Sequence, residues 1–336
     1  MTTISQPITH FLQTVKLDSL YNSTSNRTPL KQYIGAPVRE IVLTVTLGTL
    51  AGGTSPAWIA SAADAIFSKI ALQIDGGVTL KSGSYLSFKT KYKMRNFGNA
   101  LPVGTHVISF TRTPDFTVSG NSRQIYQYLL PADILGQIDL LLDIPALTAL
   151  TTGTPTSSSG TQVNISTTEE RNANIRALES TFQPLYETEY IPSSLGTSAE
   201  VPFDLPRGYV YTNVLTEAYD GTTLSDTLIT KHRLVRDNDT DLVNTTWLDM
   251  EQFNIREFNG STALGTGLAF YEAMPAFDAT VETGNKLTVK HTYGTATTSN
   301  STKVFLEYTV PMSAASIQAI KQHAAKVGST QSGTAK

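Results

Sequence analysis

Five consecutive residues, Asp237-Asn-Asp-Thr-Asp241, alternate carboxylates in the way that the start of a calcium-binding loop does. Calcium takes about six to eight oxygen ligands, which side chains spaced two apart can supply together. The EF-hand form of such a loop also needs a later glycine and a final glutamate, and this chain has Leu242 and Leu248 at those places. Two interpretations stay open: a solvated hairpin turn, which we favour, and a different calcium site with Asp237, Asp239 and Asp241 as candidate ligands.

No other group of residues matches a catalytic or cofactor motif. The phosphate-binding glycine loop, the nucleophile elbow of hydrolases and the paired-histidine helix of metalloproteases are all absent from the sequence. The five histidines stand apart from one another, and the lack of cysteine excludes disulfides, thiolate metal sites and thiol catalysis. We therefore predict a protein that is not an enzyme and has no cofactor, with calcium at the aspartates as the one candidate.

The composition narrows the range of partners. Charged residues make up 16% of the chain, against roughly 25% in an ordinary soluble domain. The net charge is −3, and no run of lysine and arginine is as dense as a nucleic-acid-binding arm, so we predict no direct nucleic-acid binding. The first residues lack the basic and apolar pattern of a secretory signal, which favours synthesis and folding in the cytoplasm.

The elements that must position any site occur twice, because the second half of the chain repeats the first about 162 positions later. The pairs at this offset are Leu72, Asp75, Leu80, Tyr85, Leu86 and Phe88 with Leu234, Asp237, Leu242, Trp247, Leu248 and Met250. Upstream, residues 39–47 match residues 207–215. A repeat of this length is a whole domain, because the units of solenoids and propellers are only about 20–50 residues long.

Strand patterns dominate both halves, because β-branched and aromatic residues alternate with polar ones between turn signals. We predict strands over 39–47, 69–74, 85–97, 106–112, 124–129, 137–142 and 162–167, and again over 207–215, 228–235, 247–258, 269–273, 286–292 and 303–310. A short helix is predicted at 56–69 with Ser55 as its cap, another at 169–180, and a flexible or exposed loop at 151–160. This density of short strands indicates a sandwich or a barrel.

Amphipathic helices are predicted at both ends of the chain. Ile8, Phe11, Leu12 and Val15 recur at helical spacing, which predicts a helix over 6–21. These four side chains would contact a membrane or the rest of a shell, or else pack beneath their own barrel. A second helix is expected from 313, with a disordered tail after it.

Two similar all-β domains between amphipathic helices, with no cysteine and no catalytic motif, resemble one family in particular. The chain is similar to the double jelly-roll major capsid proteins of tailless icosahedral viruses that enclose a lipid membrane. Corticoviruses, tectiviruses and flavobacterial lipid-containing phages are examples, and adenovirus hexon is a distant relative. The resemblance rests on the repeated strands 39–47 and 207–215 and on the repeated blocks 75–97 and 237–258. Residues 29–40 look most like coat proteins of the corticovirus-like branch.

The resemblance implies an all-β fold of two tandem eight-stranded jelly-roll barrels with short terminal helices. The corresponding division is an N-terminal helix and arm at 1–27, a first jelly roll at 28–170, a second at 171–312, and a C-terminal helix with a disordered tail at 313–336. It also implies a bacteriophage major capsid protein that forms pseudo-hexagonal homotrimers and tiles an icosahedral shell over an internal membrane. Its location would be the virion. Its partners would be neighbouring capsomers, vertex (penton) proteins and the inner lipid membrane or membrane proteins.

Two other functions stay open at this stage. A carbohydrate-binding or adhesin protein with two jelly-roll domains would use exposed aromatic residues to bind sugars, and the candidates are Tyr126, Tyr128, Trp247 and Tyr293. That interpretation does not account for helices at both ends. A glycan-active enzyme on a β-sandwich would need two carboxylates about 5–9.5 Å apart in one cleft.

Overall fold

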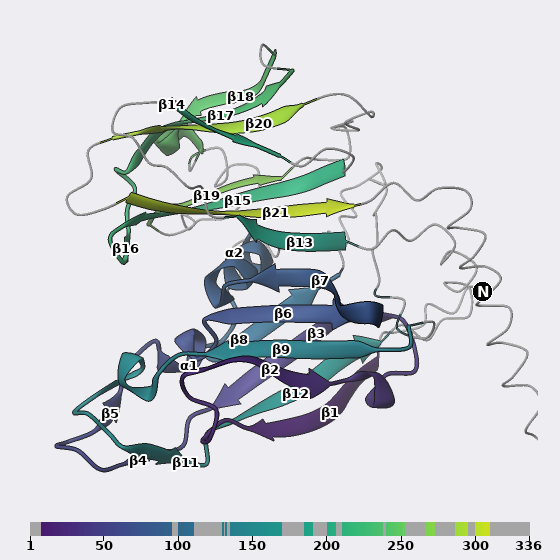
Figure 1. The fold of residues 1–336 in the computed structure, drawn as a ribbon, viewed down its shortest axis with the longest axis vertical. Helices are drawn as coiled ribbons and strands as arrows, with labels where there is room; N and C mark the ends of the chain where they lie inside the picture. The colour runs from purple at the N-terminus through teal and green to yellow at the C-terminus, as the bar shows by residue number, and fades with distance from the viewer. Residues whose placement is uncertain are drawn as a thin grey trace, which may run out of the picture. The chain divides into compact units, whose positions relative to one another are not determined.

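The computed structural model describes residues 8–95, 100–110, 130, 132, 135–169, 185–190, 200–205, 210–237, 240–250, 252, 266–272, 286–294 and 300–309. These residues fall into two compact units (Figure 1). Strands β1 to β12 belong to the first unit and β13 to β21 to the second. The repeat seen in the sequence therefore corresponds to two structural domains.

The first unit consists mainly of two four-stranded antiparallel sheets, ordered β1-β12-β3-β8 and β2-β9-β6-β7 (Figure 1). The bounds are β1 Ile8–Lys16, β2 Ser23–Pro29, β3 Val38–Thr46, β6 Lys69–Ile74, β7 Val78–Gly83, β8 Thr105–Ser109, β9 Ile138–Ile144 and β12 Gln162–Glu169. Successive long strands alternate between the two sheets, apart from the β6–β7 hairpin. This is the connectivity of an eight-stranded jelly roll.

The second unit repeats that arrangement strand for strand. Its sheets are β13-β21-β15 with β19 on the far side of β15, and β14-β20-β17-β18. The bounds are β13 Leu185–Tyr190, β14 Glu200–Asp204, β15 Val210–Asp220, β17 Ile229–Arg236, β18 Thr240–Thr246, β19 Leu268–Glu272, β20 Leu287–Tyr293 and β21 Asn300–Thr309, with a two-residue β16 at Thr223–Leu224. The predicted fold of two jelly-roll barrels is confirmed.

Alternation along the strands explains which side chains fill each barrel. In β12, Val163 and Ile165 are fully buried, and Asn164 between them faces outward. They lie opposite Val45 and Leu43 of β3, which point to the same interior. The second barrel is filled in the same way, around Leu234, Val289, Val304, Leu306 and Trp247. Period-two patterning thus places one face of each sheet in a core.

The predicted N-terminal helix is wrong over the described residues, because Ile8–Lys16 form strand β1, which pairs with β12 along its whole length. The pairing shifts register between Phe11 and Gln13, so one extra residue is inserted there. Because of the bulge, the inward-facing residues Leu12 and Val15 are three positions apart, although inward-facing residues of a regular strand are two apart. A spacing of three is also typical of one face of a helix. The first barrel therefore begins at β1 and not at residue 28.

The repeated block at 85–97 was also predicted to be a strand, and it forms helix α2 over Tyr85–Arg95. The matching residues 247–250 in the second barrel are helical as well, so the strand predicted at 247–258 is wrong there. Each helical segment begins at a hydroxyl cap. The N–H of Ser87 donates to Oγ of Ser84 over 3.0 Å, and the N–H of Asp249 donates to Oγ1 of Thr246 over 3.1 Å.

The connections of the first unit differ from their predictions too. The helix predicted at 56–69 is reduced to the single turn α1 at Ala62–Ala65, and β5 (Ala57–Trp58) precedes it. The loop predicted at 151–160 contains β10 (Thr151–Thr152), paired with β5, and β11 (Ser157–Ser159), paired with β4 (Thr49–Ala51). Short 3-10 turns complete the unit: η1 Lys31–Tyr33, η2 Asp75–Gly77 and η3 Leu147–Ala149.

Several predictions lie outside the described residues, namely the strand at 124–129, most of the helix at 169–180, and the C-terminal helix and tail at 313–336. Among the helices that the structure does describe, none has the length and apolar character needed to cross a membrane.

Candidate functional surfaces

The two described aspartates of the calcium candidate are bound by donors of the protein itself. Asp237 has a left-handed backbone (φ 51°), and its Oδ1 accepts the N–H of Lys286 over 2.8 Å. Asp241 lies on β18 and accepts Nε and Nη2 of Arg233 over 3.0 and 2.8 Å. The hydrogen bond from Arg233 lowers the pKa of Asp241 below its ordinary value. Asp239 lies outside the described residues, so the calcium candidate stays untested beside the favoured hairpin turn.

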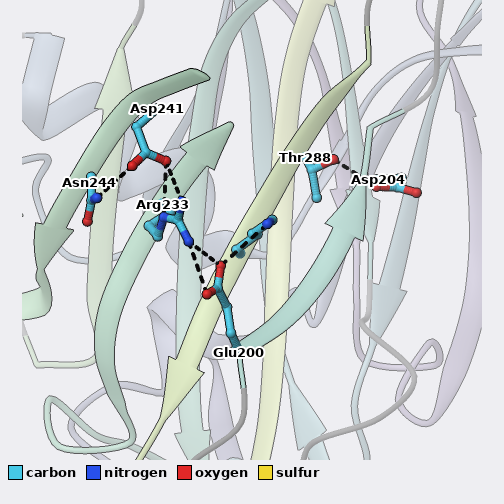
Figure 2. A network of polar contacts seen from close by, with 7 residues as sticks. Glu200, Asp204, Arg233, Asp241, Asn244 and Thr288 are labelled. Carbon is cyan, nitrogen blue, oxygen red and sulfur yellow. Dashed lines mark hydrogen bonds and ion pairs between the residues drawn. The ribbon is translucent and has the colours of Figure 1, made fainter. Parts of the chain in front are cut away.

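Arg233 is the centre of a polar network on the outer face of the β14-β20-β17-β18 sheet (Figure 2). Its Nη1 donates to both carboxylate oxygens of Glu200 on β14, over 2.8 and 3.0 Å. Lys290 lies between them on β20, with its Nζ 3.6 Å from Oε1 of Glu200. Asn244 donates to the second oxygen of Asp241 over 2.6 Å. The network crosses four strands and neutralises its own charges, so it fastens the sheet and offers little net charge to a ligand.

At one edge of the same face, Asp204 accepts the hydroxyl of Thr288 over 2.8 Å (Figure 2). Its other oxygen lies 2.9 Å from Nζ of Lys286. This outer face therefore carries alternating carboxylates and cations that satisfy one another across the strands. Cross-strand ion pairs of this kind stabilise a sheet.

The four apolar residues predicted to contact a membrane or shell are spread over both faces of β1. Leu12 is buried (7% exposed), whereas Phe11 points outward and is 65% exposed. Ile8 is 42% exposed and Val15 is half-buried. β1 is an edge strand of its sheet. The structure thus separates the set, and Phe11 is its most exposed member, followed by Ile8.

The first barrel carries an extension that sequence reasoning missed. The β4–β11 and β5–β10 ladders join residues 47–61 to 146–160, and β4, β5 and β11 lie together at one end of the unit (Figure 1). Trp58 donates its Nε1 to the carbonyl of Gly48 over 2.8 Å. Residues 41–63 and 144–168 contain no charged side chain. The sequence feature that accompanies the extension is the presence of two uncharged segments rich in Thr, Ser and Gly. Neither segment by itself predicts that the two pair as strands.

Asp18 fixes the base of this extension. Its two carboxylate oxygens accept the hydroxyl of Ser158 over 2.7 Å and the N–H groups of Gly160 and Thr161 over 2.9 and 3.0 Å. Burial by itself would raise the pKa of Asp18, but the hydrogen bonds from Ser158, Thr161 and Gly160 outweigh it and lower that pKa. The carboxylate of Asp18 thus connects the segment that follows β1 to β11 and to the residues after it.

The histidines are less scattered than the sequence indicates. His232 on β17 and His291 on β20 are directly opposite each other, both 2% exposed, with Nε2 of His291 3.0 Å from Nδ1 of His232. His106 on β8 is fully buried by itself in the first barrel. His10 lies on β1 and His323 lies outside the described residues. Among the residues that the structure describes, no three or more potential ligands gather into a metal site.

The aromatic residues proposed as sugar contacts are not on the surface where the structure describes them. Trp247 is 3% exposed and Tyr293 1% exposed, and both belong to the core of the second barrel. Tyr126 and Tyr128 lie outside the described residues. The lectin interpretation therefore loses two of its four candidate contacts.

The chain is similar to known proteins in its structure. No family model matches the sequence, and no curated protein matches it. The solved structure described as the STIV MCP is similar with a TM-score of 0.68 and 15% identity, over 91% of this chain and 98% of that one. The major capsid protein P2 from bacteriophage PM2 is similar with a TM-score of 0.59 and 13% identity, over 91% and 99%. PBCV-1 VP54 is similar with a TM-score of 0.58 and 12% identity, over 92% and 95%.

The chain has the double jelly-roll fold. The similarity spans nearly the whole of each chain, so it includes both barrels and their order. Identities of 12–15% make it a likeness of fold. The resemblance drawn from the repeated strands and blocks of the sequence is confirmed at that level.

Proposed function

We propose that this chain is the major capsid (coat) protein of an icosahedral virus and resides in the shell of the virion. The observation that carries the proposal is the pair of complete jelly rolls in one chain, shared over nine-tenths of its length with structures described as major capsid proteins. The role is structural, and no catalytic step is assigned to any residue. A two-domain carbohydrate-binding or adhesin protein is the alternative.

The proposed assembly is a homotrimer of pseudo-hexagonal outline. Two similar barrels per chain and threefold symmetry give six barrels around an axis, and such a tile packs into flat facets with other capsomers. The low charged fraction supports large contacts between copies, because obligate interfaces exceed about 2,000 Å² and have few charges in their centre. Vertex (penton) proteins, an internal lipid membrane or membrane proteins, and a bacteriophage origin belong to this proposal as further partners and context.

Native mass measured by light scattering on a sizing column tests the trimer first. A trimer has about 109 kDa, three times the 36.3 kDa mass of the chain, and an obligate trimer keeps that mass on dilution. A mass that stays at 36.3 kDa at all concentrations contradicts the assembly. Binding of that monomer on a glycan array then supports the adhesin alternative.

Phe11→Ser tests whether β1 faces a neighbour. We expect the melting temperature of the isolated chain to change little, because Phe11 is 65% exposed. We expect the trimer or the assembled particles to dissociate more readily, because an apolar contact is lost. Val103→Ser is the matched control, since Val103 is 68% exposed elsewhere on the same barrel. Flotation with anionic vesicles separates a lipid contact, which the Phe11 variant would lose, from a contact with a protein neighbour.

A further inference from the structure

The core of the second barrel contains two histidines in direct contact. His232 of β17 lies opposite His291 of β20. Two residues away along each strand, the buried residues Leu234 and Val289 lie opposite each other in the same way. The ring centroids are 5.0 Å apart, and Nε2 of His291 lies 3.0 Å from Nδ1 of His232. At that distance one nitrogen carries a proton and donates it to the other, so the geometry requires at least one neutral ring.

The surroundings offer no compensation for a positive charge. Among the described residues, the hydrophobic core around the pair contains the tyrosines Tyr211 on β15, Tyr271 on β19, Tyr293 on β20 and Tyr308 on β21, and the buried carboxylates of this unit are Glu217 and Glu307. Strands β14 and β18 pack only apolar side chains against this core, namely Val201, Phe203, Leu242 and Val243. The nearest of these rings, Tyr293, stands edge-on to His291 at 6.2 Å, and its hydroxyl is paired with Thr302 over 2.8 Å.

The charged groups nearby lie on other faces. Lys231, Arg233 and Lys290 are one position out of phase with the pair, on the outer face of its own sheet. Glu217 and Glu307 belong to the facing sheet but are out of phase with its core residues, because they sit next to Ala218 and Leu306. Behind the pair, Arg233 and Lys290 are already neutralised by Glu200 and Asp241. Among the described residues, no carboxylate shares the inward phase of the pair.

We propose that the His232–His291 pair makes the second barrel the acid-sensitive part of this chain, so that mild acid unpacks it at a higher pH than the first barrel. The second proton is the damaging one, because two imidazolium rings have only donors at the contact and repel each other. The device belongs to the isolated chain and does not depend on the proposed role in a shell.

The direction of the effect follows from where the protons bind. Burial lowers the pKa of His232 from 6.5 to about 4, and burial together with the neighbouring His232 lowers the pKa of His291 well below its usual range. The unfolded chain takes up these protons near pH 6.5 and the folded barrel resists them. The stability due to the neutral pair is therefore complete above about pH 6.5 and is lost as the pH falls toward 4.

The first barrel provides the internal comparison. His106 is fully buried against Phe67 and Tyr85, and burial followed by the charge of Lys89 lowers its pKa to about 4, while Asp64 acts in the opposite direction. Asp64 also pairs with Lys89. This barrel thus has one buried ring with a carboxylate at hand, whereas the second barrel has two coupled rings and none.

The two tryptophans allow each barrel to be followed separately, because Trp58 lies in the first unit and Trp247 in the second. Trp58→Phe leaves Trp247 as the fluorescent reporter, and Trp247→Phe leaves Trp58. Urea unfolding of both variants at pH 7.5 and pH 5.0 gives the two pH dependences. We expect the unfolding constant to rise roughly 30-fold for each buried ring, and hence roughly 30-fold more for the second barrel than for the first.

His291→Gln in the Trp58→Phe background is the decisive variant, since the amide of Gln can still donate to Nδ1 of His232. The acid response of the second barrel should then fall by roughly 30-fold, to that of a single ring. Equal pH responses of Trp58 and Trp247 in the two reporter variants overturn the proposal, and so does an undiminished acid response of His291→Gln. If this variant does not fold, the comparison of the two reporters decides alone.

Discussion

Ser84 in the first barrel and Thr246 in the second stand 162 positions apart, and each caps a helical turn with the same hydrogen bond. The strands around them pair in the same order in both units. Yet the first barrel carries the β4–β11 and β5–β10 extension, whereas the corresponding connection after β15 in the second is the short β16 hairpin. The two barrels thus share their strand order and their helix caps, whereas their connections and their core residues differ.

The interiors differ in the same manner. The first barrel buries a lone histidine between aromatic rings, and the second buries a hydrogen-bonded pair together with a tryptophan and several tyrosines. Such differences leave the topology unchanged, because a jelly roll needs only that inward positions be filled. They do change how each barrel responds to mutation and to acid. Four experiments test how far the two barrels differ.

Trp247→Ala should produce the largest loss of stability. The side chain is 3% exposed in the core of the second barrel, so truncation should lower the free energy of unfolding of that barrel by about 3–5 kcal/mol. Trp58→Ala is the matched variant in the first barrel, and it should cost less because Trp58 is only partly buried at the extension. Urea unfolding measures both. Equal losses would mean that the extension is as much a core as the barrel interior is.

Gly53→Ala should damage the extension of the first barrel without touching the second. Gly53 has φ +69°, and an added Cβ would overlap the carbonyl oxygen of Gly153. We expect a loss of about 1–3 kcal/mol, visible as a change in Trp58 fluorescence while Trp247 reports a normal barrel. Gly35→Ala is the control, because a Cβ there meets nothing within 4 Å. A silent Gly53 variant would show that the ladder tolerates a shift of its backbone.

Ser84→Ala and Thr246→Ala test whether the two caps are equivalent. Each variant loses one hydroxyl acceptor at a helix N-terminus, so each should lower stability by about 1 kcal/mol. Replacement by Gly should restore most of that loss, since Gly is a tolerated cap. Denaturant unfolding of the four variants measures the differences. A cost confined to one barrel would break the equivalence that the offset of 162 implies.

Calcium should have the smallest effect. Asp237 and Asp241 already accept hydrogen bonds from Lys286 and Arg233, so we expect millimolar calcium to leave the melting temperature unchanged. Differential scanning fluorimetry with calcium and with magnesium measures this. A rise with calcium alone that Asp239→Asn abolishes would contradict the hairpin interpretation and restore the metal site.

Short-range patterns in the sequence predict several of the strands correctly. The strand predicted at 69–74 matches β6, and the one at 286–292 matches β20 within a residue, because alternation and turn signals are complete inside each segment. The block at 85–97 misled, since Lys residues at every second place fit the solvent-facing side of a strand, whereas Lys91 is only 4% exposed in helix α2. Only the cap at Ser84 favoured the helix, and one hydroxyl is a weak signal.

The offset of 162 and the strand-rich composition were enough for two tandem all-β domains, because composition and periodicity can be read from the chain without knowing which strands pair. The tertiary structure decided what depends on pairing between distant residues. It placed Ile8–Lys16 in a barrel, through hydrogen bonds to β12 and a bulge that no local pattern reveals. It also joined residues 49–51 to 157–159, and brought together His232 and His291, which are 59 positions apart in the sequence. Which distant strands pair depends on packing contacts that form only when the chain folds, so no pattern within either segment reveals the pairing.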